Sequence, residues 1–282
     1  MDNWIDLIRN PGNPTKLSLS EDKITSDAEE IFKIVGNNIT YLKSSGLSDE
    51  WESRQDVSVS RYDAPDYNSF DAIPELFGSF IAARHEKGQI VFDIGCGISS
   101  KLPIYAQILP VGSYLGLEPL TKIVRRDYPC IIGAVSEKIP LADQSVDTIV
   151  FATSLDHVED IEATGREVRR ILKLNGRIVI WTGIYDPESI SQAKSFHPIL
   201  YHGSMLKRVV RGLLIPLDYL YLLYRTAQRA RKMKNSIPLD NVHFRYYTRQ
   251  SIEVQLEVWG FKVSRRVVVP GSSSMFIEGY IE

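Results

Sequence analysis

The chain has 282 residues, 44% hydrophobic and 24% charged, which is enough apolar mass for one large domain and a small one. A formal net charge of −2 excludes the strong overall basic field that attracts nucleic acids. The two cysteines, Cys96 and Cys130, lack the CxxC spacing of a zinc site, so we expect free thiols and no metal ligands.

The sequence predicts a cytoplasmic protein. Its first residues contain no basic stretch followed by an apolar run, which argues against a secretory signal. The longest apolar stretch, residues 209–224, contains two charged side chains and a proline and is too short to span a bilayer.

Residues 1–45 are predicted to form a small β-rich unit, because short strand-like runs alternate there with turn-forming residues. The runs are 16–19, 31–35 and 38–42. The polar stretch 49–67 reads as a linker, and 69–84 places its apolar residues mostly on one helical face. We therefore expect a linker and a helix over 46–87.

From residue 88 to 282 the pattern predicts an α/β domain with a doubly wound sheet. Apolar runs of about five residues are typical of strands buried on both faces of a parallel sheet. The clearest helix, 161–172, ends before Asn175 and Gly176, which are helix-stop residues. The predicted strands are 90–94, 113–117, 130–134, 146–151 and 177–181, followed by an antiparallel edge hairpin of 261–269 and 275–281.

Two features in the first half of this domain indicate a nucleoside ligand. Asp93, Gly95 and Gly97 end the first strand in a glycine turn, which lets a backbone approach a ligand closely. Glu118 ends the next strand, 25 positions after Asp93, where an acid can accept both ribose hydroxyls. A tight turn and an exposed loop glutamate, both without a ligand, are the alternatives.

With these motifs the chain resembles class I methyltransferases. Three further segments resemble motifs of the family that includes ubiquinone and menaquinone biosynthesis methyltransferases. Residues 136–147 (SEKIPLADQSVD) resemble that family's AExLPFxDxSFD segment. Residues 154–160 (SLDHVED) resemble its LEHV segment, and 169–176 (RRILKLNG) its RVLKPGG segment. The resemblance runs from residue 88 to the end and weakens after Gly183.

The resemblance implies a Rossmann-like seven-stranded sheet of order 3-2-1-4-5-7-6, with S-adenosylmethionine over the carboxyl ends of strands one to four. The chain departs from the family at Ser99, where a third glycine is common, and at Val135, where an aspartate often binds the adenine amino group. The cofactor-binding residues that the resemblance implies are Asp93, Gly95, Cys96 and Gly97, then Glu118 at the ribose, Val135 and Ser136 at the adenine, and Thr153 at the methionine end.

Residues 7–17 resemble the LRCPxCGGPL opening of small zinc-ribbon-like domains, some of which activate or precede methyltransferase domains. Asn10 and either Gly12 or Asn13 stand near the positions of the family's cysteines. The resemblance therefore implies that residues 1–45 form a unit without a metal. It would pack on the catalytic domain or on a neighbouring subunit. An unrelated β-rich extension is the alternative.

His157 and His243 are the candidate catalytic residues, because histidine titrates near neutral pH and both follow segments that lead toward the site. A structural role is the alternative for His157, and packing before a helix cap at Thr248 is the alternative for His243.

Residues 183–239, between strands five and six, are predicted to be a helical lid insertion. Within it, 205–234 carries eight basic residues and one acid around the apolar run 213–224. This composition favours an acidic or lipid-linked acceptor or peripheral contact with a membrane. A core-packed helix with a solvated basic face is the alternative.

Together these features predict an S-adenosylmethionine-dependent methyltransferase that O-methylates a small molecule, a glycan or a lipid-linked intermediate. A homo-oligomer is compatible with the sequence, and nucleic acid is not an expected partner. The alternatives are a methyltransferase acting on RNA or protein, a catalytically silent cofactor-binding scaffold and an NAD-dependent oxidoreductase.

Overall fold

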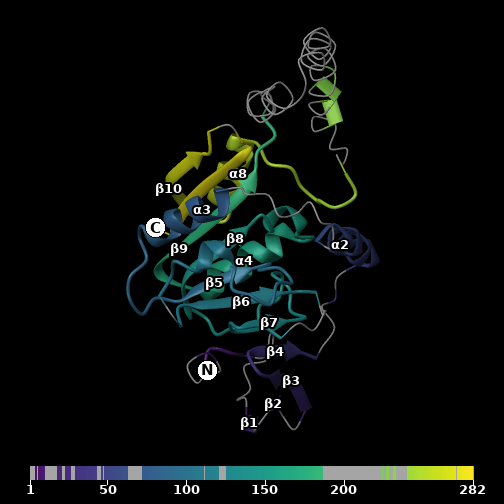
Figure 1. The fold of residues 1–282 in the computed structure, drawn as a ribbon, viewed down its shortest axis with the longest axis vertical. Coiled ribbons are helices and arrows are strands. Elements are labelled where there is room, and N and C mark those ends of the chain that lie inside the picture. Colours follow the sequence, from purple (N-terminus) through teal and green to yellow (C-terminus); the bar gives the residue numbers. More distant parts are fainter. Residues whose placement is uncertain are drawn as a thin grey trace, which may run out of the picture.

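Figure 1 shows the computed structural model of the chain as a single large sheet with helices packed against it. The structure describes residues 4, 6–9, 18–20, 23–26, 29–42, 46, 48–62, 72–110, 112–120, 125–186, 224, 227–228, 231–232, 240–270 and 272–281. Side chains are described for these residues except 18–20, 26, 29–30 and 58–62.

The described strands form one mixed sheet in the order β1-β2-β3-β4-β7-β6-β5-β8-β9-β11-β10. The five central strands β7, β6, β5, β8 and β9 run parallel to one another. The strand bounds are β1 Ser18–Ser20, β2 Lys23–Ser26, β3 Glu29–Val35, β4 Asn38–Tyr41, β5 Val91–Ile94, β6 Tyr114–Glu118, β7 Cys130–Ile132, β8 Val146–Ala152, β9 Leu172–Gly183, β10 Phe261–Val268 and β11 Ser274–Ile281.

The prediction of a seven-stranded sheet is wrong in extent, because the N-terminal residues add four strands to its β7 edge. Strands β1 to β4 form an antiparallel meander, and β4 then pairs parallel with β7. At the opposite edge β11 lies antiparallel to both β9 and β10, which confirms the predicted antiparallel hairpin.

Both faces of the central strands are buried, as their short apolar runs predict. On β8, Ile149 and Phe151 point into one hydrophobic cluster, and Val150 points into the other. The first cluster includes side chains of helices α4 (Ile161–Ile171) and α8 (Arg249–Val258), and the second includes those of α3 (Ile73–Ala82). Because side chains alternate along a strand, helices on both faces complete a three-layer α/β fold.

The helix ends follow local sequence signals. Asp160 caps α4 by accepting hydrogen bonds from the backbone N–H groups of Glu162 and Ala163. Thr248 and Ser251 form a reciprocal capping box at the start of α8, as the predicted Thr248 cap requires.

The prediction of a linker over 49–67 is wrong for its first part, because Asp49–Tyr62 form helix α2. Ser48 precedes this helix, and its hydroxyl accepts a hydrogen bond from the backbone N–H of Trp51. Acidic residues fill the first turn, where the helix dipole favours negative charge.

The N-terminal segment lies against the loop that follows β7. Ile8 forms an antiparallel bridge with Leu141, and both side chains are buried. The backbone N–H of Arg9 donates to the carbonyl of Pro140, and that of Ala142 donates to the carbonyl of Leu7. The N-terminal residues therefore join this domain through its sheet and through this loop.

The predicted helical lid falls almost wholly on residues 187–223, 225–226, 229–230 and 233–239, which lie outside the described residues. The ends of the insertion are described: Ile184 bridges Tyr247, and the backbone N–H of Tyr185 donates to the carbonyl of Tyr247. Among the described helices, none has the length and apolar character needed to cross a membrane.

Candidate functional site

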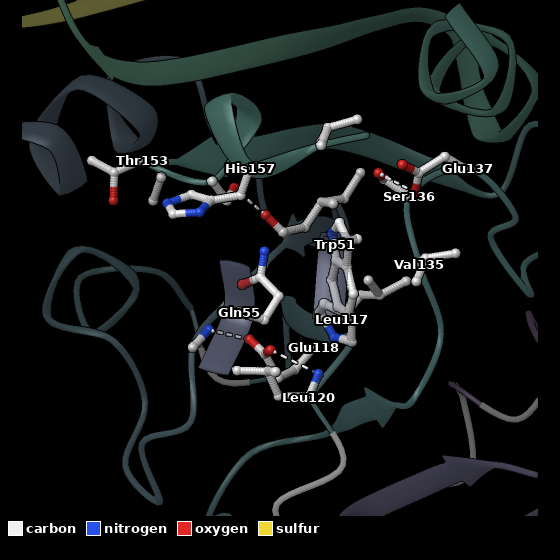
Figure 2. Close-up of a pocket in the computed structure, with 17 residues that line it drawn as sticks. Trp51, Gln55, Leu117, Glu118, Leu120, Val135, Ser136, Glu137, Thr153 and His157 are labelled. Carbon is white, nitrogen blue, oxygen red and sulfur yellow. Dashed lines mark hydrogen bonds between the residues drawn. The ribbon is translucent and has the colours of Figure 1, made fainter. Parts of the chain in front are cut away.

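A cavity lies at the carboxyl ends of β5, β6 and β8, with about 690 Å³ of empty space that includes its open mouth (Figure 2). This is the edge at which parallel α/β sheets bind ligands. Its lining residues are Trp51, Gln55, Ile94, Gly95, Gly97, Leu117, Glu118, Pro119, Leu120, Val135, Ser136, Glu137, Ala152, Thr153, Ser154, His157 and Val158.

The glycine turn after β5 forms one wall of this cavity. Gly95 and Gly97 have φ values of 77° and 82°, which lie in the left-handed region that favours glycine. A Cβ atom on Gly95 would lie 2.5 Å from the Cβ atom of Ser154. The turn therefore requires glycine both for its backbone angles and for its contact with the segment after β8.

Glu118 ends β6 and contributes a buried carboxylate to the cavity. Its Oε2 atom accepts a hydrogen bond from the backbone N–H of Gly97 at 2.8 Å, and its Oε1 atom accepts one from Leu120 at 3.0 Å (Figure 2). Burial raises the pKa of Glu118 to about 7, and these two backbone hydrogen bonds oppose that rise.

Asp93 and Cys96 do not line the cavity, although both belong to the motif from which the sequence predicts cofactor contacts. Asp93 is fully buried, and its Oδ2 atom accepts hydrogen bonds from the hydroxyls of Tyr105 and Tyr114. Burial raises the pKa of Asp93 to about 6. The Sγ atom of Cys96 lies 3.6 Å from that of Cys130 beneath the turn. Both thiols are free, as predicted.

Val135 and Ser136 line the side of the cavity formed by the loop after β7. The hydroxyl of Ser136 lies 2.9 Å from that of Thr164 on α4. The same loop is fixed from α4 by Arg170, which donates to the carbonyls of Ile139 and Leu141. The 136–147 segment therefore shapes the cavity wall mainly through contacts with α4.

Thr153 follows β8 with a φ of 58°. A β-branched residue rarely adopts this left-handed conformation, and such residues concentrate at functional sites. Thr153 lines the cavity, and its backbone N–H donates to the carbonyl of Trp181.

Helix α2 supplies two cavity residues that the sequence analysis does not identify, Trp51 and Gln55. They lie one helical turn apart, and both are more than nine-tenths buried. The Nε2 atom of Gln55 is buried and has no hydrogen-bond partner in the described part of the chain. Figure 2 shows the Gln55 side chain between those of Glu118 and His157. The sequence signal was Ser48 followed by three acids within four residues, which is typical of a helix N-terminus.

The two candidate catalytic histidines come together at the rim of this cavity. His157 lines it directly, whereas His243 lies behind, with the two ring centroids 4.8 Å apart. The Nε2 atom of His243 lies 3.6 Å from Asp156 Oδ2, and its Nδ1 atom lies 2.8 Å from Asp240 Oδ2. The backbone N–H groups of Phe244 and Arg245 donate to the carbonyl of Asp156 and join the two segments.

The two aspartates of this cluster differ in their electrostatics. Burial raises the pKa of Asp156 to about 6, although His243 opposes that rise. Burial also acts to raise the pKa of Asp240, but hydrogen bonds from the backbone of His243 and Val242 and from the His243 ring outweigh it and hold that pKa at about 2. Asp240 is therefore a permanent anion beside the His243 ring at neutral pH.

The central part of the chain matches a known family: residues 92–180 match the family described as Methyltransferase domain. The Sterol 4-C-methyltransferase strm-1 of Caenorhabditis elegans is 25% identical over 126 residues, which cover 40% of this chain. That match covers 38% of the curated relative, so the chain spans well under half of its length.

Solved structures share the fold at low identity. The PH0226 protein of Pyrococcus horikoshii OT3 is 16% identical with a TM-score of 0.52, over 79% of this chain and 99% of that one. The Burkholderia thailandensis 1,6-didemethyltoxoflavin-N1-methyltransferase, solved with bound 1,6-didemethyltoxoflavin and S-adenosylhomocysteine, is 13% identical with a TM-score of 0.52, over 86% and 94% of the two chains. The fold is therefore the Rossmann-like α/β fold.

S-adenosylmethionine fits the residues of this cavity on three observations. The buried Glu118 carboxylate is an acceptor for hydroxyl donors, and the Gln55 amide nitrogen is a buried donor without a partner in the described part of the chain. At Gly97 an added Cβ atom would meet nothing within 4 Å, so the backbone of the glycine turn borders open space there. Residues 92–180 therefore match a methyltransferase domain, and the cavity that they help to form suits S-adenosylmethionine.

Proposed function

We propose that this protein transfers a methyl group from S-adenosylmethionine to an oxygen atom of a small-molecule acceptor. One observation carries the proposal: the glycine turn, the Glu118 carboxylate and the His157 imidazole line a single cavity. When bound, S-adenosylmethionine supplies a methyl group on a positively charged sulfur that leaves as a neutral thioether. The protein has to align the acceptor with that methyl group and exclude water.

In this proposal the cofactor contacts follow the order of the cavity wall. Glu118 accepts hydrogen bonds from the ribose hydroxyls, and Val135 and Ser136 flank the adenine. Gly95, Gly97 and Thr153 contact the methionine part. Asp93 and Cys96 act from below, because their side chains support the glycine turn instead of lining the cavity.

We assign the acceptor end of the site to His157 and His243. Among the ionisable side chains that line the cavity, His157 lies farthest from Val135 and Ser136, the proposed adenine side. The His243 ring lies next to the His157 ring. In this role both act on the acceptor's nucleophile, so their loss should lower turnover and leave cofactor affinity nearly unchanged.

A small and mainly apolar acceptor is favoured over a macromolecule. The curated relative is named for a sterol, and the cavity wall contains Trp51, Leu120, Ala152 and Val158. The 136–147 and 154–160 segments favour the biosynthetic subfamily that includes quinone methyltransferases. A sterol-like or lipid-linked biosynthetic intermediate with a hydroxyl is therefore our first choice of acceptor class.

We also propose that residues 88–282 are the catalytic unit and that the zinc-ribbon-like N-terminal residues 1–45 serve as a structural extension of it. The pairing of β4 with β7 supports a structural role, because it joins the two parts in one sheet. The contact between Ile8 and Leu141 supports the same role.

The test is transfer of a labelled methyl group to a panel of sterols, quinols and lipid-linked glycans, with calorimetry of S-adenosylhomocysteine binding in parallel. His157→Ala should lower kcat at least tenfold with little change in cofactor affinity. His85→Ala is the matched control, because His85 precedes the amino end of β5 and the cavity lies at the carboxyl end of that strand. Cofactor binding without transfer to any acceptor class would support a scaffold role, and preferred binding of NAD would end the methyltransferase proposal.

A further inference from the structure

Beside the cavity, Asp156, His157 and His243 place nitrogen and carboxylate oxygen atoms around one point. One ligand atom from each of the three lies within 4.8 Å of those of the other two. The Nε2 atom of His243 lies 3.6 Å from Asp156 Oδ2, and that of His157 lies 3.9 Å from Asp156 Oδ1. The two imidazoles therefore face the two oxygens of one carboxylate.

These separations suit a shared cation better than direct hydrogen bonds. A hydrogen bond between nitrogen and oxygen normally spans about 2.7–3.2 Å. Imidazole and carboxylate ligands bind Zn²⁺ at about 2.0–2.2 Å, so neighbouring ligand atoms around one ion lie roughly 3.0–3.5 Å apart. Movements of about 1 Å or less for each side chain would bring the three groups to that spacing.

The carboxylate of Asp156 independently points to a missing ligand. Asp156 is 8% exposed, and its Oδ1 atom accepts no hydrogen bond in the described part of the chain. A buried carboxylate oxygen without a partner is costly, and a bound cation would remove that cost. The backbone carbonyl of Asp156 accepts hydrogen bonds from the N–H groups of Phe244 and Arg245, so the backbone that carries this side chain is fixed beside His243.

Asp240 orients His243 in the manner of a residue behind a metal ligand. Its Oδ2 atom lies 2.8 Å from His243 Nδ1, and its Oδ1 atom accepts hydrogen bonds from the backbone N–H groups of Val242 and His243. A carboxylate that accepts the Nδ1 proton leaves the Nε2 lone pair pointing outward, as metal-bound histidines require. In that tautomer the Nε2 lone pair faces the Asp156 carboxylate, and a cation between the two groups would relieve their repulsion.

We propose that Asp156, His157 and His243 bind one first-row divalent cation, with Zn²⁺ as the best match, and that this cation binds the acceptor's nucleophilic oxygen. Two imidazoles and one carboxylate are a donor set that such cations favour, and three protein ligands leave a coordination position open. His157 lines the cavity, so a cation held by these residues would border the space in which we expect the acceptor. This inference rests on the proposed function and extends it to the way in which the histidines act.

The cation would make the acceptor a better nucleophile. A hydroxyl bound to it loses its proton to solvent, and the resulting oxygen anion attacks the methyl carbon. The carbon–sulfur bond breaks with its electron pair on the sulfur, which gives a methyl ether, S-adenosylhomocysteine and one released proton.

The sequence prediction of no metal ligands rests on missing thiolates, whereas this cluster uses imidazole and carboxylate groups from segments that lie far apart in the chain. His243 follows the 183–239 insertion, and Asp156 and His157 follow β8. Their meeting is a property of the fold, and neither segment alone has metal-ligand spacing.

The test is titration of the full chain, stripped with a chelator and free of any affinity tag, with Zn²⁺ by calorimetry and with Co²⁺ by visible absorption. We expect one equivalent to bind at micromolar concentration or below, with the strong d–d bands of a low-symmetry nitrogen and oxygen site. Absence of stoichiometric binding by both ions would overturn the inference and leave the histidines as direct proton acceptors.

Variants locate the ion. His243→Ala and Asp156→Asn should each weaken Zn²⁺ binding at least 100-fold, and Asp240→Asn should weaken it about 10- to 100-fold by releasing the His243 ring. His85→Ala is the control and should bind Zn²⁺ as the wild type does. Unchanged affinity in both ligand variants would refute the site, wherever the ion then binds.

Cofactor binding separates this inference from the proposed function. S-adenosylhomocysteine calorimetry is run on the same samples, and retained affinity also shows that a variant is folded. If the cofactor binds and methyl transfer proceeds without the ion, the metal inference fails and the proposed function stands. If Zn²⁺ binds at these residues and S-adenosylhomocysteine does not bind, the metal site stands and the proposed function fails.

Discussion

The carboxylate of Glu118 accepts a hydrogen bond from the backbone N–H of Gly97 at 2.8 Å, which joins the acid at the end of β6 to the glycine turn after β5. The two motifs are therefore one structural unit. The hydrogen bond fixes the carboxylate before any ligand arrives, so little side-chain entropy is lost on binding.

Removal of this carboxylate should weaken cofactor binding without unfolding the protein. Glu118→Ala is expected to reduce the affinity for S-adenosylhomocysteine by roughly 1–3 kcal/mol, because charge-assisted hydrogen bonds to the ribose are lost. Calorimetry measures the effect, and Glu75→Ala, an exposed acid in the first turn of α3, is the control. Equal affinities for the two variants would show that Glu118 does not contact the ligand.

Glu118 should also make binding and stability depend on pH in opposite directions. Its pKa of about 7 lies above the ordinary 4.5, mainly because of burial. Its protonated form is therefore favoured in the ligand-free fold. Its stabilising contribution is complete below pH 4.5 and is lost as the pH rises through 7, at most roughly 3 kcal/mol. Ribose hydroxyls bind the ionised carboxylate more strongly than the neutral acid, so cofactor affinity should rise up to about tenfold from pH 6 to 8.

Glu118→Gln is the control for both effects, because it keeps the shape of the side chain without the titration. The unfolding free energy of the wild type should decrease relative to that of the variant as the pH rises from 4.5 to 7. The variant's cofactor affinity should stay constant from pH 6 to 8. A wild-type affinity that is equally flat would place the titration of Glu118 outside this range.

Much of the central sheet could be predicted because its strands are short apolar runs buried on both faces. In β8, Ile149, Val150 and Phe151 alternate between the two cores, so all three of these consecutive positions are hydrophobic. The start of α4 was predictable from a different local signal. Asp160 is a strong N-cap, and its position decides where the helix begins.

The rest could not be predicted because it depends on contacts between distant segments. Helix α2 is polar, and Trp51 and Gln55 are buried only because the helix lies over a cavity made by other elements. Likewise Asp156 and His243 meet only because backbone hydrogen bonds join the segment after β8 to the one before α8. Local propensity contains no information on either contact.

Gln55 should influence the cofactor more than the fold. Its Nε2 atom is buried without a hydrogen-bond partner in the described part of the chain, which is unfavourable when the cavity is empty. Gln55→Ala should therefore leave the stability of the ligand-free protein unchanged or slightly higher. The same change should weaken S-adenosylhomocysteine binding by about 0.5–1.5 kcal/mol, the contribution of one hydrogen bond.

Thermal unfolding with and without S-adenosylhomocysteine measures both quantities in one experiment. The smaller ligand-induced rise in Tm is the signature of a lost cofactor contact. A less stable ligand-free variant with unchanged affinity would instead identify Gln55 as a packing residue of α2.

Gly95 should be more sensitive to substitution than another glycine with a similar backbone. Gly95 and Gly36 have φ values of 77° and 61°, so alanine at either costs roughly 1–2 kcal/mol in backbone strain. At Gly36 the added Cβ atom would meet nothing within 4 Å, whereas at Gly95 it would lie 2.5 Å from the Cβ atom of Ser154. That atom is attached to the backbone and cannot rotate away, so Gly95→Ala should cost about 1–3 kcal/mol more.

Urea unfolding of Gly95→Ala and Gly36→Ala compares the two costs, and calorimetry compares their cofactor affinities. Only Gly95→Ala should weaken S-adenosylhomocysteine binding, because only this turn lines the cavity. Adding Ser154→Gly to Gly95→Ala removes the facing Cβ atom and should recover part of the lost stability. The added change also removes the hydrogen bond from the Ser154 hydroxyl to the carbonyl of Ile94, so recovery should be incomplete. If both single variants unfold at the same urea concentration, the close approach of the turn to Ser154 is not what requires glycine at position 95.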